Sequence, residues 1–164
     1  MFTRILLAVD GTDSGDVAVS FTSALARQFD AEVRVVHVNE LLVGGRGFAA
    51  ETELEAMDIV DRAVARFRGT GVSADGVHFF ANCFTLDDRI AEAAREWGAD
   101  VIVFGSKRRR RLARLTGRGL RERVTALTGL PTLVAPAPLR LGRRVVRREL
   151  DPAAFQSLDD LIVS

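Results

Sequence analysis

Short apolar runs that alternate with segments of helical periodicity constrain this sequence more than any other feature. A run with no polar face is typical of a parallel strand buried on both sides of a sheet, whereas a half-exposed strand alternates polar and apolar residues. Parallel strands need long crossover connections, which are usually helices. The alternation therefore predicts an α/β fold with a doubly wound, five-stranded parallel sheet. The expected strands span residues 5–9, 33–38, 77–81, 101–104 and 131–135.

Four segments between these runs repeat apolar residues at helical spacing and are expected to form the crossover helices. The order is strand then helix, repeated four times, and closed by a fifth strand. Thr12 and Gly98 are typical residues for a helix start and a helix stop. The residues expected to face the core are Val17, Phe21, Ala24 and Leu25, then Leu54, Met57, Val60, Val64 and Phe67, then Leu86, Ile90, Ala94 and Trp97, and finally Leu120, Val124 and Leu127.

The predicted topology also indicates where a ligand would bind. In an open parallel sheet, ligands bind beyond the carboxyl ends of the strands, where the strand order reverses. This places the expected crevice at Asp10, at His37 and Val38, and at Gly105. Asp10 ends a buried strand there and is the candidate functional carboxylate.

The chain length of 164 residues suits one domain with a substantial core. The composition changes after residue 136, so we expect a domain at 1–136 and an extension at 137–164. An arginine-rich stretch at 139–149 begins the extension. Asp151 and Pro152 then open a short amphipathic helix, with apolar residues at Phe155, Leu158, Leu161 and Ile162.

Charge is distributed unevenly along the chain, although its net value is only +1. Residues 1–104 carry 9 Arg and Lys against 17 Asp and Glu, while residues 105–123 carry nine basic residues against Glu122. The basic run at 107–111 raises the possibility of nucleic-acid binding, but no aromatic residue is interleaved for base stacking. A solvated loop, or one that pairs with an acidic partner subunit, is the favoured interpretation.

Several patterns point to structural roles and to a soluble, cytoplasmic protein. No apolar run is long enough to span a membrane, and no signal-type segment opens the chain. Cys83 is expected to be a buried thiol, and His37 and His78 lack metal-site spacing, so no metal is expected. The pair Asp87–Asp88 is expected to begin the third helix rather than to form an acid/base pair. The crevice offers no nucleophile with a base and an orienting group, so we expect no enzyme activity.

Four segments in this order and spacing resemble the marker segments of universal stress proteins. They span residues 5–12, 35–38, 99–106 and 130–134. The resemblance covers residues 2–136 and implies the adenine nucleotide alpha hydrolase-like fold, a role in the stress response and an unidentified protein partner. It also implies a homodimer that pairs the fifth strands, residues 131–135. In family members that bind ATP, residues matching Asp10 and Val38 lie at the nucleotide and at adenine.

The same family holds phosphates along a loop of the form G-x2-G-x9-G-(S/T), in which glycine lets backbone N–H groups approach the anion. In this sequence Gly105 matches the first glycine and is followed by Ser106. Arg108 stands at the second glycine, Arg118 at the third, and Gly119 at the Ser/Thr position. A shift of one residue would put Gly119 at the third glycine and Leu120 at the Ser/Thr position, which still lacks the hydroxyl.

Two interpretations of these arginines remain open. The side chains could fill the phosphate space, so that the chain binds no cofactor and acts as a regulatory or interaction protein. Alternatively, guanidinium groups could replace the lost backbone donors and hold a nucleotide such as ATP, or another anion, in a changed pose. An ATP-hydrolysing relative would carry a Gly/Ser-rich loop after the first strand, where this chain has Asp10-Gly11-Thr12-Asp13.

Overall fold

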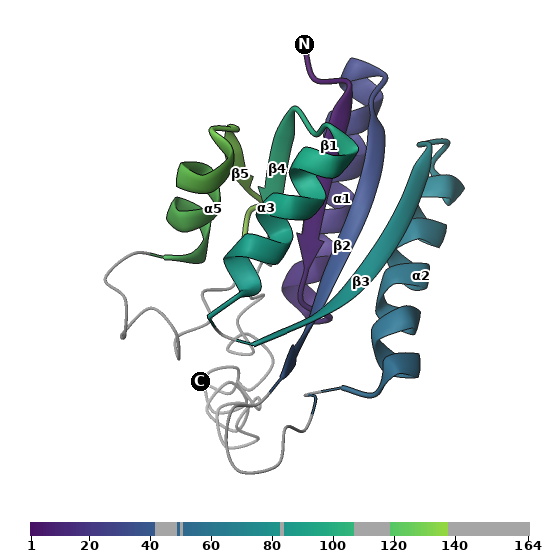
Figure 1. Cartoon of the computed structure of the whole chain (residues 1–164). Coiled ribbons are helices and arrows are strands. Elements are labelled where there is room, and N and C mark those ends of the chain that lie inside the picture. Colours follow the sequence, from purple (N-terminus) through teal and green to yellow (C-terminus); the bar gives the residue numbers. More distant parts are fainter. Residues whose placement is uncertain (42–48, 50, 83, 107–118, 138–164) are drawn as a thin grey trace, which may run out of the picture.

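A computed structural model describes residues 1–41, 49, 51–82, 84–106 and 119–137. Strands and helices alternate in the expected order (Figure 1). The strands are β1 (Arg4–Val9), β2 (Glu32–Leu41), β3 (Ala74–Asn82), β4 (Val101–Phe104) and β5 (Thr132–Val134). The helices are α1 (Asp13–Phe29), α2 (Glu53–Gly69), α3 (Leu86–Trp97) and α5 (Leu120–Thr128).

The five strands form one sheet in the order β3-β2-β1-β4-β5, and every neighbouring pair is parallel. The chain moves from β1 outward through β2 to β3, and then returns to place β4 on the other side of β1. The order therefore reverses between β1 and β4, which makes the carboxyl ends of these two strands the switch point. This sheet confirms the predicted fold class.

Two apolar clusters cover the two faces of the sheet. Helices α1 and α2 pack on one face, where Ile5, Leu7 and Val35 are fully buried with Phe67 of α2. Helices α3 and α5 pack on the other face over Leu6, Val36 and Ile102. Consecutive residues of β1 and β2 thus enter opposite clusters, which explains why β1 is apolar without interruption from Ile5 to Val9.

Burial follows the predicted helix faces with four exceptions. In α1 Ala24 is exposed, while Ala18 and Ala26 are buried, because the buried face lies about one position away from the predicted stripe. In α5 Leu127 is 42% exposed because this short helix lies at the margin of the sheet. In α2 Leu54 and Met57 were predicted to face the core but are exposed.

Some predictions fall outside the described residues. These are the predicted thiol environment of Cys83, the basic run at 107–111 with Arg108 and Arg118, and the short amphipathic helix expected to begin at Asp151 and Pro152. Among the described residues, none of the helices is long and apolar enough to cross a membrane.

Candidate functional site

The carboxyl ends of β1, β2 and β4 bring the predicted crevice residues to one edge of the sheet. Val9 lies beside His37 in the register of β1 and β2, and Ala8 lies beside Phe104 in the register of β1 and β4. Val38, Asp10 and Gly105 therefore lie at the carboxyl ends of three adjacent strands, β2, β1 and β4, at the switch point. The Val38 side chain is 6% exposed within the α3/α5 cluster, which leaves little of it for a ligand.

The turn from β1 into α1 is held by the Asp10 carboxylate. Its Oδ1 accepts a hydrogen bond from the Thr12 hydroxyl at 2.6 Å and another from the Thr12 backbone N–H at 3.2 Å. Gly11 has a φ of +70°, and a Cβ there would lie 2.7 Å from Cδ1 of Ile59. The left-handed backbone favours glycine here, and the close approach of Ile59 adds to the cost of any side chain at this position.

His37 lies under this turn with no solvent exposure and uses both of its ring nitrogens. Nδ1 is 3.0 Å from the Val9 carbonyl oxygen, and Nε2 is 2.5 Å from Oε2 of Glu51. A carbonyl oxygen only accepts, so Nδ1 carries a proton and donates to Val9. The bonds confirm a structural role for His37, and they leave neither nitrogen available to activate a nucleophile.

Glu51 is held by a second buried side chain of β2, Asn39. The Asn39 Nδ2 donates to the Glu51 carbonyl oxygen at 2.6 Å, and its Oδ1 accepts from the Glu51 N–H at 3.2 Å. Leu41 and Ala49 also form an antiparallel bridge. The chain entering α2 is therefore fastened back over the end of β2 beside Gly11, where Glu51 Oε1 lies 3.8 Å from the position of a Gly11 Cβ.

Sequence reasoning did not find Glu51 as a residue of this edge. Its partners lie 12 and 14 positions earlier, and the intervening connection carries no periodic signal that fixes its return. The one available sign was that His37 and Asn39 are polar residues spaced two apart, on one face of the strand, among buried valines near its end.

Helix α5 begins beside Gly105, the residue that matches the first glycine of the phosphate loop. The Glu122 carboxylate accepts a hydrogen bond of 2.6 Å from the N–H of Gly119, which closes the first turn. Leu120 is half-buried against the α3/α5 cluster. Arg121 reaches across to Gly105, whose carbonyl oxygen lies 3.3 Å from Nη2 of the guanidinium.

The next arginine of α5, Arg123, is used for packing. Its Nε lies 2.6 Å from Oδ2 of Asp87, and both side chains are largely buried. Asp87 and Asp88 are in the first turn of α3, as the sequence predicted. The pair ties the starts of α3 and α5 together, so Asp87 serves as an ion-pair partner rather than as a free acid.

The structure thus gathers Asp10, Val38, Gly105 and Ser106 with Gly119 and Leu120 around the carboxyl edge. Arg108 and Arg118 lie outside the described residues. Arg121, one of the nine basic residues of 105–123, is the guanidinium that the described residues place at Gly105. Among these residues, no group of three or more His, Cys, Asp or Glu side chains is arranged to hold a metal ion.

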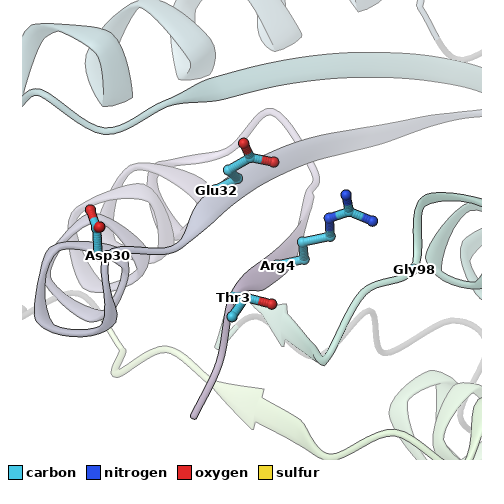
Figure 2. A pocket seen from close by; sticks show the side chains of 5 residues that line it. All are labelled: Thr3, Arg4, Asp30, Glu32 and Gly98. Carbon is cyan, nitrogen blue, oxygen red and sulfur yellow. The ribbon is translucent and has the colours of Figure 1, made fainter.

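An open cavity of about 440 Å³ lies at the opposite, amino-terminal edge of the sheet (Figure 2). It is lined by Thr3, Arg4, Asp30, Glu32 and Gly98. We do not assign it as the functional site, because ligands of such sheets bind at the carboxyl edge.

Contacts near this cavity also serve the fold. Arg4 donates to the Trp97 carbonyl oxygen at 3.0 Å, and its guanidinium lies 5.9 Å from the Trp97 ring centroid. The pKa of Asp100 is lowered by hydrogen bonds from the Thr3 hydroxyl, from the Thr3 N–H and from the Arg4 N–H. These bonds fix the start of β1 against the start of β4.

Comparison with known proteins finds the same architecture elsewhere. A family model described as the universal stress protein family matches residues 1–136. Universal stress protein YxiE of Bacillus subtilis (strain 168) is 26% identical over 149 residues, covering 82% of this chain and 99% of that protein.

Solved structures agree with this match. A universal stress protein family member from Burkholderia pseudomallei is 25% identical with a TM-score of 0.60, covering 82% of this chain and 96% of that one. The universal stress protein from Archaeoglobus fulgidus in complex with dAMP is 23% identical with a TM-score of 0.60, covering 82% and 98%.

Proposed function

Because the chain belongs to the universal stress protein family, we propose that it is a non-catalytic regulatory or interaction protein of the stress response that does not hold ATP in the family's usual manner. One observation carries this proposal: the guanidinium of Arg121 lies against Gly105. Gly105 is the position where the phosphate loop of an ATP-binding relative begins.

A phosphate loop works when the backbone can approach the anion without side chains in the way. Here a long side chain from the first turn of α5 already contacts the carbonyl group of Gly105, 3.3 Å away. The sequence adds arginine at both remaining glycine positions, 108 and 118. A triphosphate laid along this path would meet side chains where the family motif provides none.

The polar side chains described at the carboxyl edge of the sheet are used within the fold, and on this ground we propose that the chain is not a catalyst. The imidazole of His37 is buried between Val9 and Glu51, so it cannot reach a substrate. The Asp10 carboxylate holds the turn through Thr12. Purified protein should therefore release no phosphate from ATP above the rate without protein, and turnover at ordinary enzyme rates would overturn this part of the proposal.

The same arginine favours a second candidate, a nucleotide-binding or anion-binding switch. A guanidinium at the crevice can hold a phosphate group bidentately. Relatives of the same fold have been solved with dAMP, cAMP and AMP, which each carry a single phosphate. A monophosphate would need fewer donors than a triphosphate, and Asp10 could accept a ribose hydroxyl.

Calorimetric titration separates the two candidates. Wild-type protein and the variants Arg121→Gln and Asp10→Asn are titrated with ATP, AMP and inorganic phosphate. Arg95→Gln, an exposed arginine in the last turn of α3, is the matched control.

If the chain is a regulatory protein without a nucleotide site, none of the three ligands should give a saturable heat of binding. The switch predicts saturable AMP binding that Arg121→Gln and Asp10→Asn weaken and Arg95→Gln preserves. Tight ATP binding that survives Arg121→Gln would contradict both candidates and would indicate the ordinary family site.

We also propose a cytoplasmic homodimer that pairs β5 with its copy. The strand is at the sheet margin, Val134 is 43% exposed, and Leu127 of the neighbouring helix is 42% exposed. An uncovered strand edge is a template for pairing with another chain. Light scattering should give twice the monomer mass for wild type and a lower mass for Val134→Asp; a wild-type monomer would refute the dimer.

A further inference from the structure

Helix α2 carries two apolar side chains outside the face that covers the core. Val60 and Phe67 are buried against the sheet, at 5% and 0% exposure. The buried face continues toward the start of the helix through Ala56, at 0% exposure. Met57, at 43% exposure, and Leu54, at 77%, lie beside this face. The first two turns of α2 therefore present apolar side chains that nothing in the described residues covers.

The neighbouring strand extends this exposed surface. Phe80 of β3 is 41% exposed, and its ring lies 6.2 Å from that of His78 at an angle of 79°. Nε2 of His78 is 4.0 Å from Oε1 of Glu53, which places the start of α2 beside this part of β3. We call Leu54, Met57 and Phe80 the α2–β3 patch. Figure 1 shows α2 and β3 at the margin of the sheet opposite α5 and β5.

The position of the patch is fixed by close packing. A Cβ on Gly76 would lie 2.3 Å from Cγ1 of Val60 and 3.1 Å from Cγ2 of Val64, so α2 rests directly on the β3 backbone. The helix start is also fixed, because Thr52 and Glu55 form a capping box. The exposure of Leu54 and Met57 is thus a property of a firmly placed helix rather than of a frayed end.

The surroundings of the patch are acidic. Residues 51–61 carry five carboxylates and no Lys or Arg: Glu51, Glu53, Glu55, Asp58 and Asp61. The first base, Arg62, pairs with Asp58. A partner for this surface should combine apolar side chains with positive charge.

We propose that residues 138–164 of the same chain cover the α2–β3 patch. They lie beyond the family match, which ends at residue 136. The segment carries five arginines at 140–148, which would lie along the acids of α2. Its apolar positions Phe155, Leu158, Leu161 and Ile162 would pack on the patch.

The chain is long enough for this assignment. The described residues end just after β5, at the carboxyl edge where α2 starts. β5 and β3 are separated by four strand spacings of about 4.8 Å each, which is roughly 19 Å across the sheet. Residues 138–154 alone can span roughly 55 Å when extended. The amphipathic positions can therefore reach the patch without moving any strand.

Photocrosslinking of the full chain tests the assignment. A p-benzoyl-phenylalanine is placed at position 54, and at position 127 on the opposite margin as the control. Crosslinks made in an equal mixture of light and heavy-isotope protein are then mapped by mass spectrometry. We expect position 54 to link to residues 150–164 within single chains, and position 127 not to do so. Links from position 54 only between chains, or none to residues 138–164, would overturn the proposal.

A pair of variants tests whether the crosslink depends on the apolar side of the segment. Leu158→Asp puts a charge on the apolar side of the segment, while Gln156→Asp puts the same charge on its polar side. We expect Leu158→Asp to lower the crosslink yield several-fold and Gln156→Asp to leave it unchanged, with equal urea midpoints for the domain. Equal yields in the two variants would refute packing through the apolar positions.

Discussion

Replacing Gly11 by alanine tests whether the crevice turn depends on both backbone conformation and contact with α2. Gly11 has a φ of +70°, and a Cβ there would lie 2.7 Å from Cδ1 of Ile59. The left-handed backbone costs alanine about 1–2 kcal/mol, and the lower entropy of the unfolded chain offsets about half of this. The contact adds about 1 kcal/mol, at the low end for overpacking, because Cδ1 is the end of a side chain that can move. We expect a total loss of about 2 kcal/mol.

A matched control separates the two contributions. Gly71 has a φ of +78°, but a Cβ there would have no atom within 4 Å. Gly71→Ala should therefore lose only about 1 kcal/mol, which is the net backbone cost. Ile59→Val removes Cδ1 and on its own should cost about 0.5–1.5 kcal/mol. When Ile59→Val is combined with Gly11→Ala, the cost of Ile59→Val should fall or change sign, because the added Cβ then no longer meets Cδ1.

Urea unfolding at equilibrium, monitored by circular dichroism, measures the free energy of unfolding of wild type, of the three single variants and of the double variant Gly11→Ala/Ile59→Val. Unchanged m-values would show that the variants differ in stability and not in the extent of unfolding. Equal losses for Gly11→Ala and Gly71→Ala would refute the contact with Ile59. So would strictly additive effects of Gly11→Ala and Ile59→Val, because residues in contact should show coupling.

Two further predictions concern the elements that position the crevice. Asp100 has a lowered pKa in the folded protein, so its contribution to stability is present above the unfolded pKa and is lost as pH falls through the folded one. Asp100→Asn should cost about 1 kcal/mol at pH 7, a small value because solvent screens the charge of this partly exposed group. The difference in stability from wild type should vanish under strongly acidic conditions, and a loss that does not depend on pH would contradict this. Thr52→Ala should cost about 1 kcal/mol by removing the capping box of α2. Thr85→Ala, at a helix start without a side-chain cap, should cost clearly less, and equal losses in urea unfolding would refute the capping argument.

The sequence was sufficient to predict the elements of the fold because burial on both faces marks a strand directly. Ile5 and Leu6 enter opposite clusters, and their run reads as a strand without any knowledge of its neighbours. Asp10 and Gly105 could be placed at one edge from topology alone. The limits of β2 were less visible, since Asn39 and Glu40 continue the strand as polar residues.

What sequence reasoning missed depends on contacts between distant residues. The bond from His37 to Glu51 depends on the path of the connection into α2, and the bond from Arg121 to Gly105 depends on how α5 is placed beside β4. In α2 periodicity identified the buried residues from Val60 onward, but at the start of the helix the buried residue is Ala56 and not Met57. Leu54 therefore looked like a core residue in the sequence and is 77% exposed in the fold.

The nucleotide content of the protein as isolated from cells tests the central claim most directly. Acid-quenched protein is analysed by chromatography and mass spectrometry, and the amount of ATP is compared with the amount of chain. Because a guanidinium lies at Gly105 and arginine replaces glycine at 108 and 118, we predict far less than one ATP per chain. Stoichiometric ATP that is lost on Asp10→Ala would contradict the account.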